Sequence, residues 1–290
     1  MLKFYVLVSA NRFALKRHER SIPKEDMVVI INTKDPQFEK DAVTYCATNN
    51  IEHYVTKSDG TPSTGKNRLL DIFEKSPYDH AVMVDGDDVI TEYGVFYYKS
   101  IAASENPPDA VALKNQQGLE LGLIHYSSNS PEPEKNEYGD VNPNSLHPRI
   151  FMPFRQRNVL DHYIKHLPKG SVPRDWAEYC IKYIDVEETH FRVTFISKKA
   201  ASMYRFNDLL IGEDTCMFLN YKDAHNNGKL QLVYHDEKDN PTYLYDTRLD
   251  GIVEKTTADA RKKGEVPAWL GTLVNTYKEY EKLGKLWEVA

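Results

Sequence analysis

Strand and helix signals alternate along the first hundred residues, and this alternation restricts the possible folds strongly. Short runs rich in Val, Ile and aromatic residues predict buried strands, and apolar residues at helical spacing predict helices between them. The predicted strands are 4–9, 27–32, 54–56 and 81–84, and the predicted helices are 35–50 and 67–75. Such alternation is typical of an α/β fold with a mostly parallel sheet. Ligands bind at the carboxyl ends of the strands in such sheets, so the polar residues that follow each strand are the candidate site residues.

The rest of the chain carries weaker signals. Residues 190–196 and 230–234 predict two more strands, and residues 213–220 predict a helix. Residues 127–144 are rich in Ser, Asn, Pro and Glu, as in a long loop. The end of the sequence, 267–290, has the apolar spacing of an amphipathic helix.

Composition excludes several classes of protein. The chain has 290 residues, of which 41 % are hydrophobic and 28 % charged, unlike a collagen-like, coiled-coil or wholly disordered chain. Its three cysteines, Cys46, Cys180 and Cys216, are widely spaced, which excludes a disulfide framework and predicts a reducing, cytoplasmic setting. The apolar stretch at 4–10 is interpreted as a strand rather than a secretory signal, because polar residues follow it at once. No apolar run reaches the roughly 18 residues of a membrane span.

Three carboxylates gather where the fourth predicted strand ends, in the sequence Asp85-Gly86-Asp87-Asp88. Their mutual repulsion is unfavourable unless a cation or hydrogen-bond donors offset it. Oxygen ligands of this kind suit Mg²⁺ or Mn²⁺ held together with substrate phosphates. The alternative is an acidic turn that caps a helix. An EF-hand loop is excluded because Ile90 stands at the sixth position, where that loop needs glycine.

A second motif imitates a phosphate-binding loop. Residues 60–66 match the pattern GxxxxGK after a strand and before a helix, and the strand ending in Asp85 would complete a P-loop phosphotransferase. Asn67 disfavours this alternative because a P-loop has Ser or Thr at that position, and only one short helix separates the two motifs. In either case Lys66 and Arg68 are candidates to contact a diphosphate.

A third signal is the pair Glu213-Asp214 at the start of the predicted helix 213–220. Two acidic residues at a helix start ordinarily cap the helix and complement its dipole. They become candidate site residues only together with the carboxylates at 85–88.

In order and spacing these residues resemble the GT-A glycosyltransferases, most closely those of the broad family 2 type. Asp85-Gly86-Asp87 resembles the DxD motif of that family, and Glu213-Asp214 resembles its late Glu-Asp motif. Ser9-Ala10-Asn11-Arg12 resembles its polar turn after the first strand. The match covers residues 1–100 and 200–250.

The resemblance implies a GT-A fold, which is Rossmann-like, with a mostly parallel central sheet flanked by helices and a C-terminal helical extension. A single GT-A domain would have a nucleotide-sugar-binding half over 1–115 and an acceptor-binding half over 116–250. The C-terminal helices would occupy 251–290.

The resemblance also implies a metal-dependent enzyme that moves a hexosyl or pentosyl group from a nucleoside diphosphate sugar, expected to be a UDP-sugar, to a hydroxyl with inversion. Asp214 would be the catalytic base, assisted by Glu213. Mn²⁺ or Mg²⁺ would bind Asp85 and Asp87, with His235 where some members have a further ligand. The residues expected to bind the donor are Ser9, Asn11, Arg12, Asn32, Asp35, Lys66, Asn67, Arg68, Asp85 and Gly86. A non-catalytic nucleotide-sugar-binding protein is the alternative outside enzymes.

Two acceptor classes stay open: a saccharide, and a hydroxymethylated base in DNA as for certain phage enzymes. The formal net charge is −6, but residues 147–175 carry six basic residues against two acidic ones, interleaved with aromatic rings. Such a segment suits a polyanion such as DNA, or is an ordinary solvated surface or an oligomer contact. The residues expected to contact the acceptor are Arg149, Arg155, Arg157 and Trp176.

Overall fold

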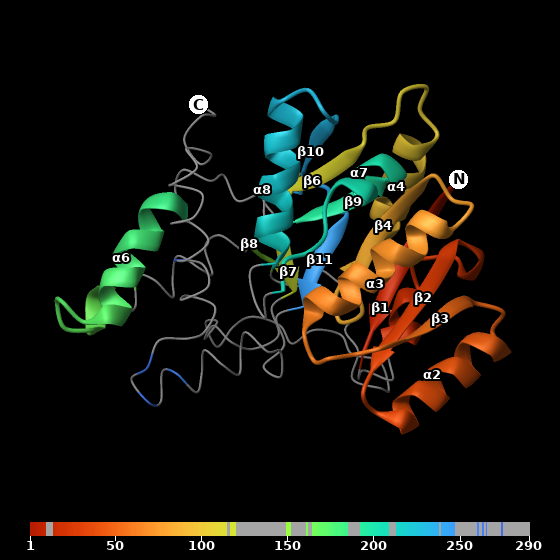
Figure 1. Ribbon diagram of the computed structural model, residues 1–290, viewed down its shortest axis with the longest axis horizontal. Helices are drawn as coiled ribbons and strands as arrows, with labels where there is room; N and C mark the ends of the chain where they lie inside the picture. Colours follow the sequence, from red (N-terminus) through yellow and green to blue (C-terminus); the bar gives the residue numbers. More distant parts are fainter. Residues whose placement is uncertain are drawn as a thin grey trace.

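The structure of the protein is a computed structural model (Figure 1). It describes residues 1–9, 14–114, 117–119, 149–151, 161, 164–184, 192–208, 213–237 and 239–246, together with 260, 263, 265 and 274. The loop predicted at 127–144 lies outside the described residues, and so does the helix predicted at 267–290 apart from Val274.

A seven-stranded sheet forms the centre of the fold, in the order β10-β6-β9-β4-β1-β2-β3. Four of its strands are β1 (Leu2–Val8), β2 (Met27–Thr33), β3 (Glu52–Lys57) and β4 (His80–Asp85). These four strands run parallel to one another, and β1 lies between β2 and β4. Parallel neighbours need crossover connections, which are supplied here by α2 (Pro36–Thr48) and α3 (Pro62–Lys75). The carboxyl ends of β1, β2 and β4 therefore meet at the same edge of the sheet.

Three later strands complete the same sheet: β6 (Ala110–Lys114), β9 (Val193–Ser197) and β10 (Leu232–Asp236). β10 pairs parallel with β6, whereas β9 lies between β4 and β6 and runs antiparallel to both. The central sheet is thus mostly parallel and is flanked by helices, which confirms the predicted α/β class. The antiparallel direction of β9 is important for the site, because it brings the amino end of that strand to the carboxyl end of β4.

The sheet buries a hydrophobic layer on each face. Phe4, Val6 and Val8 of β1 pack with residues of α2 on one face, and Tyr5 packs with residues of α3 on the other. Successive side chains of a strand point to opposite faces, which explains why the central strands β1, β2 and β4 are rich in apolar residues. The helices that complete the two layers are α4 (Glu92–Ala102) on the face of α2, and α7 (Lys198–Met203) and α8 (Glu213–Asn226) on the face of α3.

A four-stranded sheet has the order β5-β11-β7-β8. Its strands are β5 (Val89–Ile90), β11 (Tyr243–Asp246), β7 (Gln117–Leu119) and β8 (Arg149–Phe151). β5 follows the acidic turn after β4 directly and pairs antiparallel with β11. This pairing brings Tyr243, which is distant in sequence, next to the turn.

The strands and helices predicted within the described residues are confirmed, with shifted boundaries, whereas the C-terminal helices predicted over 251–290 lie almost entirely outside those residues. α3 begins at Pro62 rather than at residue 67, because the Thr61 side chain accepts a hydrogen bond from the Thr64 amide and the proline occupies the first turn. No clear sequence pattern indicates α4, α7, β6 or the helices α1 (Ala14–His18), η1 (Lys24–Asp26) and α6 (Val172–Ile184). None of the helices in the described ranges is long and apolar enough to cross a membrane.

Candidate active site

β4 ends in a tight turn that carries the acidic run. The N–H of Gly86 donates to the carbonyl oxygen of Leu7 at 2.8 Å. A Cβ atom at Gly86 would lie 2.6 Å from the same oxygen, so the turn approaches β1 too closely for a side chain. After the turn Asp87 is exposed, whereas Asp88 points inward and is only 1 % exposed. The three carboxylates therefore have different environments, and Asp87 is the most exposed of them.

A buried cation reaches this turn from β9. In the antiparallel pairing of β9 with β4, Ser197 lies opposite His80 and Phe195 opposite Val82. The same register, continued to the end of β4, sets Arg192 opposite Asp85. Only 6 % of Arg192 is exposed.

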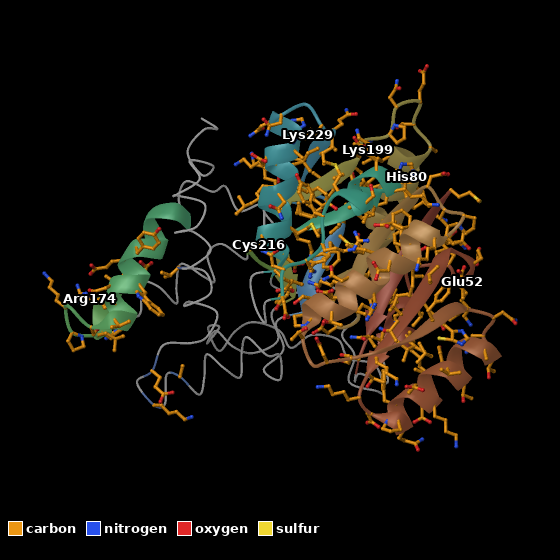
Figure 2. All side chains as sticks on the ribbon, in the orientation of Figure 1. Glu52, His80, Arg174, Lys199, Cys216 and Lys229 are labelled. Atoms are coloured by element: carbon orange, nitrogen blue, oxygen red, sulfur yellow. The ribbon has the colours of Figure 1, made fainter. Side chains whose placement is uncertain are left out.

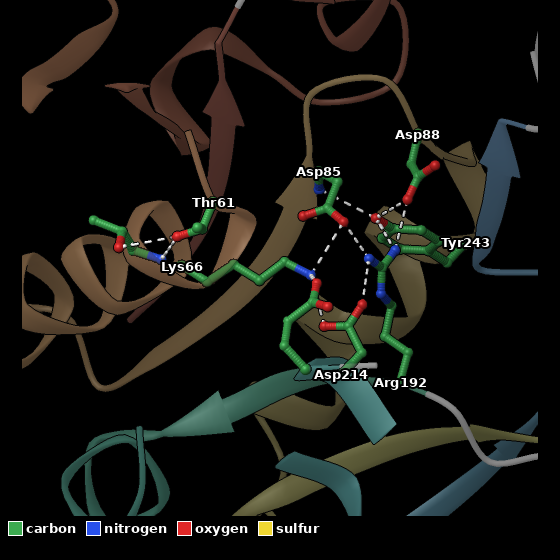
Figure 3. A network of polar contacts seen from close by, with 9 residues as sticks. Thr61, Lys66, Asp85, Asp88, Arg192, Asp214 and Tyr243 are labelled. Atoms are coloured by element: carbon green, nitrogen blue, oxygen red, sulfur yellow. Dashed lines mark hydrogen bonds and ion pairs between the residues drawn. The ribbon is translucent and has the colours of Figure 1, made fainter. Parts of the chain in front are cut away.

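The Arg192 guanidinium bridges several groups at once (Figure 3). Its Nη1 donates to Oδ2 of Asp88 at 2.6 Å and to the hydroxyl of Tyr243 at 2.5 Å. Its Nη2 donates to Oδ2 of Asp85 and, at 3.0 Å, to Oδ2 of Asp214. The guanidinium carbon also lies 4.7 Å from the centre of the Tyr243 ring. Arginine suits this position because its planar fork presents donors in fixed directions.

Lys66 reaches the same cluster from α3, as Figure 3 shows. Its Nζ donates to Oδ1 of Asp214 at 2.7 Å and to Oε1 of Glu213 at 2.8 Å. It also lies 3.4 Å from Oδ2 of Asp85. Lys66 and Arg192 therefore join the acidic residues at the start of α8 to the carboxylates at the end of β4.

The segment 60–66 does not form a P-loop. A P-loop holds phosphate with the backbone N–H groups of a loop that precedes the helix, whereas residues 62–66 here belong to α3 itself. Gly65 serves packing, because a Cβ atom there would lie 2.7 Å from Nδ2 of Asn32 and 3.1 Å from Cδ2 of Leu7. The alternative of a P-loop phosphotransferase is therefore wrong.

The electrostatics of the cluster follow from burial and from the two cations. Burial raises the pKa of Asp85, but the charges of Arg192 and Lys66 outweigh it and lower the pKa to about 2. Burial raises the pKa of Asp88 to about 7 against the opposing charge of Arg192. Burial also raises the pKa of Glu213, although Lys66 opposes it. Of Asp85, Asp88 and Glu213, Asp85 is therefore the carboxylate that the two cations hold most firmly in the ionised state.

A second layer of hydrogen bonds fixes Tyr243. Glu237 is fully buried, and its Oε2 accepts from the amides of Thr242 and Tyr243 at 2.9 and 3.0 Å. The Tyr243 hydroxyl in turn donates to Oδ2 of Asp88 at 2.6 Å and accepts from the Asp85 amide at 3.1 Å. Burial raises the pKa of Glu237 to about 7. Glu237 thus orders the chain that carries the Tyr243 ring and hydroxyl to the cluster.

Among the predicted donor-binding residues, Asn32 and Asp35 lie at the carboxyl end of β2, and these two and Asn67 make structural contacts. The Asn32 amide oxygen accepts from the Thr56 hydroxyl at 2.9 Å. Asp35 caps α2 by accepting from two backbone amides. Asn67 donates to the Phe206 carbonyl at 2.9 Å and accepts from the Phe206 amide at 2.7 Å. Their contacts with a donor stay predictions.

The remaining predicted donor residues divide into two groups. Ser9 follows β1 and is exposed, and Arg68 is exposed on α3 with its Nη1 3.7 Å from Oδ2 of Asp71. Asn11 and Arg12 lie outside the described residues.

The predicted divalent cation can be tested against the oxygen donors present. Within the described ranges no group of three or more His, Cys, Asp or Glu residues is arranged to hold a metal ion. Asp88 is bound to Arg192, and Asp85 is shared between Arg192 and Lys66. Mg²⁺ often takes only one or two protein carboxylates together with substrate phosphates. Exposed Asp87, next to Asp85, fits a cation shared with a diphosphate in this way.

The contacts of His235 lie away from the carboxylate cluster. It lies on β10, from which β6 and β9 separate β4. Its ring centre is 4.1 Å from that of Tyr97, and its Nε2 lies 3.0 Å from the Asn240 carbonyl oxygen. Its role as a metal ligand stays a prediction.

The predicted acceptor residues are only partly described. The backbone of Arg149 pairs with Leu119 in the smaller sheet. Trp176 lies in α6 and is half-buried. Arg155 and Arg157 lie outside the described residues. Acceptor binding by these residues stays a prediction.

Sequence reasoning missed Arg192, Tyr243 and Glu237. Arg192 belongs to a segment that was predicted as a strand, and no local motif surrounds it. The signal that could have found it is the pairing of that strand with β4, which the sequence pattern does not provide. Tyr243 likewise reaches the site through the pairing of β11 with β5. Glu237 directly follows β10 and is joined to that strand pair by its hydrogen bonds to the amides of Thr242 and Tyr243.

Comparison with known proteins shows structural similarity at low sequence identity. No protein-family model matches the sequence, and no curated protein is similar to it. The structure resembles S. aureus TarS 1–349 in complex with UDP-GlcNAc, with 14 % identity, a TM-score of 0.48, and coverage of 88 % of this chain and 61 % of that one. It also resembles the mannosyltransferase PcManGT from Pyrobaculum calidifontis in complex with GDP-Man and Mn²⁺, with 10 % identity, a TM-score of 0.47, and coverage of 99 % and 71 %.

The chain spans 44 % of the length of the complete S. aureus TarS structure, at 12 % identity and a TM-score of 0.48. Similarity of this degree does not determine an activity.

Proposed function

We propose that the protein is a glycosyltransferase of the GT-A type, which binds a nucleoside diphosphate sugar at the carboxyl ends of the central strands and transfers the sugar to a hydroxyl group. One observation carries this proposal. Carboxylates from two distant segments lie in one cluster bridged by buried cations: Asp85 and Asp88 at the end of β4 and in the turn after it, and Glu213 and Asp214 at the start of α8. This edge of an open α/β sheet is where such folds bind their ligands.

In the proposed reaction the bond between the anomeric carbon and the diphosphate oxygen breaks, and a bond to the acceptor oxygen forms. The acceptor hydroxyl loses its proton to Asp214, and the diphosphate leaves with the electron pair. Asp214 retains capacity for this role, because a carboxylate offers about four acceptor sites and its side chain is 27 % exposed. Glu213 would assist from beside it. A single displacement of this kind inverts the anomeric carbon.

Asp87, with Asp85, would hold Mn²⁺ or Mg²⁺ together with the diphosphate. When bound, such a cation supplies stabilisation of the negative charge on the departing group. A UDP-sugar is the proposed donor. The proposed acceptor is a hydroxyl of a saccharide or of a hydroxymethylated base in DNA.

A thermal-shift screen tests the proposal. The ligands are UDP, GDP, CDP and ADP and the nucleotide sugars UDP-glucose, UDP-N-acetylglucosamine and GDP-mannose, each with and without Mn²⁺. A ligand at one hundred times its Kd stabilises the folded state by about 2.7 kcal/mol, so the expected result is a clear rise in Tm with one nucleotide class. A rise with ATP and Mg²⁺ alone, or with no nucleotide, would contradict the proposal.

The acceptor is identified by transfer of labelled sugar from the donor so found. Oligosaccharides and duplex DNA that contains hydroxymethylcytosine form the two arms of the assay. Transfer to DNA should fall steeply with added salt, because phosphate contacts release counterions, whereas transfer to a neutral oligosaccharide should not. Binding without transfer to either arm, and without release of diphosphate in water, would favour a non-catalytic nucleotide-sugar-binding protein.

A further inference from the structure

Among the residues that the structure describes, Arg192 is the buried cation that contacts both the end of β4 and Asp214 through a single rigid group. Its Nη2 donates both to Asp85 and to Oδ2 of Asp214, and its Nη1 donates to Asp88. Lys66 also contacts the two segments, but through a flexible side chain that ends in a single nitrogen. The separation between the acidic turn and Asp214 therefore depends chiefly on the guanidinium.

Asp214 is held from both sides. Lys66 donates to its Oδ1 at 2.7 Å, and Arg192 donates to its Oδ2 at 3.0 Å. Two donors that approach different oxygens fix the rotation of a carboxylate as well as its position, because each oxygen has preferred directions for hydrogen bonds. Without Arg192, the Asp214 carboxylate would be free to turn about its contact with Lys66.

Arg192 is itself fixed by the small sheet. The Tyr243 hydroxyl accepts from Nη1, and the Tyr243 ring lies under the guanidinium at 4.7 Å. The position of that ring depends on Glu237, which accepts from the Tyr243 amide. A chain of contacts thus runs from β11 through the guanidinium to the start of α8.

We propose that Arg192 is a positioning residue, which orients the Asp214 carboxylate relative to the nucleotide-sugar site at the end of β4. This inference rests on the proposed function, in which Asp214 takes the acceptor proton. Arg192 acts through Asp214, so its replacement should lower the rate of the chemical step and leave donor affinity nearly unchanged. A misplacement of about 1 Å at a reacting group can lower a rate by about a hundredfold.

The test compares R192K with wild type and with R205K. Lysine keeps the charge but cannot bridge three carboxylates in a fixed plane. Arg205 is the matched control, because it also pairs with two carboxylates, Asp71 and Glu74, but is 38 % exposed on another surface. Donor affinity is measured by calorimetry with the nucleotide sugars of the screen. The chemical step is measured as release of nucleoside diphosphate with water as acceptor, so that no acceptor has to be known.

The expected result for R192K is a kcat reduced by about a hundredfold, a donor Kd within about threefold of wild type, and no change in R205K. An unchanged kcat in R192K would overturn the inference. An equal loss of affinity and kcat would also overturn it, because Arg192 would then be a ligand of the donor.

A second variant, Y243F, keeps the test decisive should R192K fail to fold. It removes the hydroxyl that contacts Arg192, Asp88 and the Asp85 amide but keeps the ring. Its kcat should fall with donor Kd retained, and wild-type kcat in Y243F would count against the inference. If wild type itself neither binds nor cleaves any nucleotide sugar, the proposed function fails and this inference fails with it. If wild type is active but R192K and Y243F keep the wild-type kcat, only this inference is overturned, and the proposed function stays intact.

Discussion

Replacement of Lys66 by methionine measures how strongly the cluster depends on its buried cations. The Lys66 side chain is 7 % exposed and contacts Glu213, Asp214 and Asp85. These charges raise its pKa even though burial alone would lower it. Methionine fills a similar volume and removes the charge, so the three carboxylates lose a shared partner. Breaking a buried ion pair on one side destabilises a protein by about 3–5 kcal/mol, and we expect a loss of this size for K66M.

The loss should depend on pH in a defined direction. A buried carboxylate without its cation takes up a proton instead of staying charged, so its pKa in the folded state rises. The folded variant then binds protons more tightly than the unfolded chain, and its stability falls as pH rises above the unfolded pKa. K66M should therefore be closer to wild type at pH 5 than at pH 8.

Equilibrium unfolding in urea is the assay, with the midpoint read at constant m-value. The matched control is K199M, because Lys199, labelled in Figure 2, lies 2.8 Å from Oδ2 of Asp109 but is 58 % exposed. Lys199 follows the carboxyl end of β9, whereas Arg192 precedes its amino end. A surface pair contributes about 1 kcal/mol or less. The double variant K66M/E213Q should recover part of the loss, because it removes one of the uncompensated charges. A K66M midpoint equal to that of K199M would show that the carboxylate cluster does not depend on the Lys66 charge.

Two further perturbations test the parts that position the site. E237Q replaces a carboxyl group whose pKa is raised by burial to about 7. The free energy of unfolding of wild type should therefore fall by up to about 3 kcal/mol as pH rises from 4.5 to 7. Urea unfolding of E237Q should show a flatter pH profile, and identical profiles would contradict this expectation. G86A places a Cβ atom 2.6 Å from the Leu7 carbonyl oxygen. The resulting strain should lower the free energy of unfolding by about 1–3 kcal/mol and weaken Mn²⁺-dependent nucleotide binding in calorimetry. A variant with the wild-type midpoint and affinity would show that the turn can move freely.

The sequence predicts well those parts of the fold that local pattern determines. The strands β1, β2 and β4 are continuous apolar runs, and the carboxylates after β4 stand next to each other in the chain. α4 is not recognisable in the sequence, because aromatic and aliphatic residues occur on all sides of the helix, as in its segment Tyr93–Tyr98. The segment therefore has no single polar face that would indicate a helix. The start of α3 was placed too late because Pro, Ser, Thr and Gly, which open this helix, are also the residues of loops.

The site was predicted in part for the same reason. Asp85, Glu213 and Asp214 stand in recognisable local motifs, and the structure brings them together. Arg192 depends on the pairing of β9 with β4, more than a hundred residues earlier in the chain, and such a pairing leaves no mark on the residues around the arginine. The motif at 60–66 predicts that Lys66 contacts phosphate, whereas the groups next to Lys66 in the fold are the carboxylates of Asp85, Glu213 and Asp214.

The proposed glycosyl transfer is tested by measuring the release of nucleoside diphosphate from a bound nucleotide sugar by wild type, D214N and D87N. Removal of a general base lowers a rate by about 10²- to 10⁴-fold. D214N should therefore bind the donor with wild-type affinity and lose turnover by this factor, whereas D87N should lose Mn²⁺-dependent donor binding. D71N, on the exposed surface of α3, serves as control and should behave as wild type. Wild-type turnover in D214N would contradict the central claim that the cluster at the end of β4 and the start of α8 is a glycosyl-transfer site.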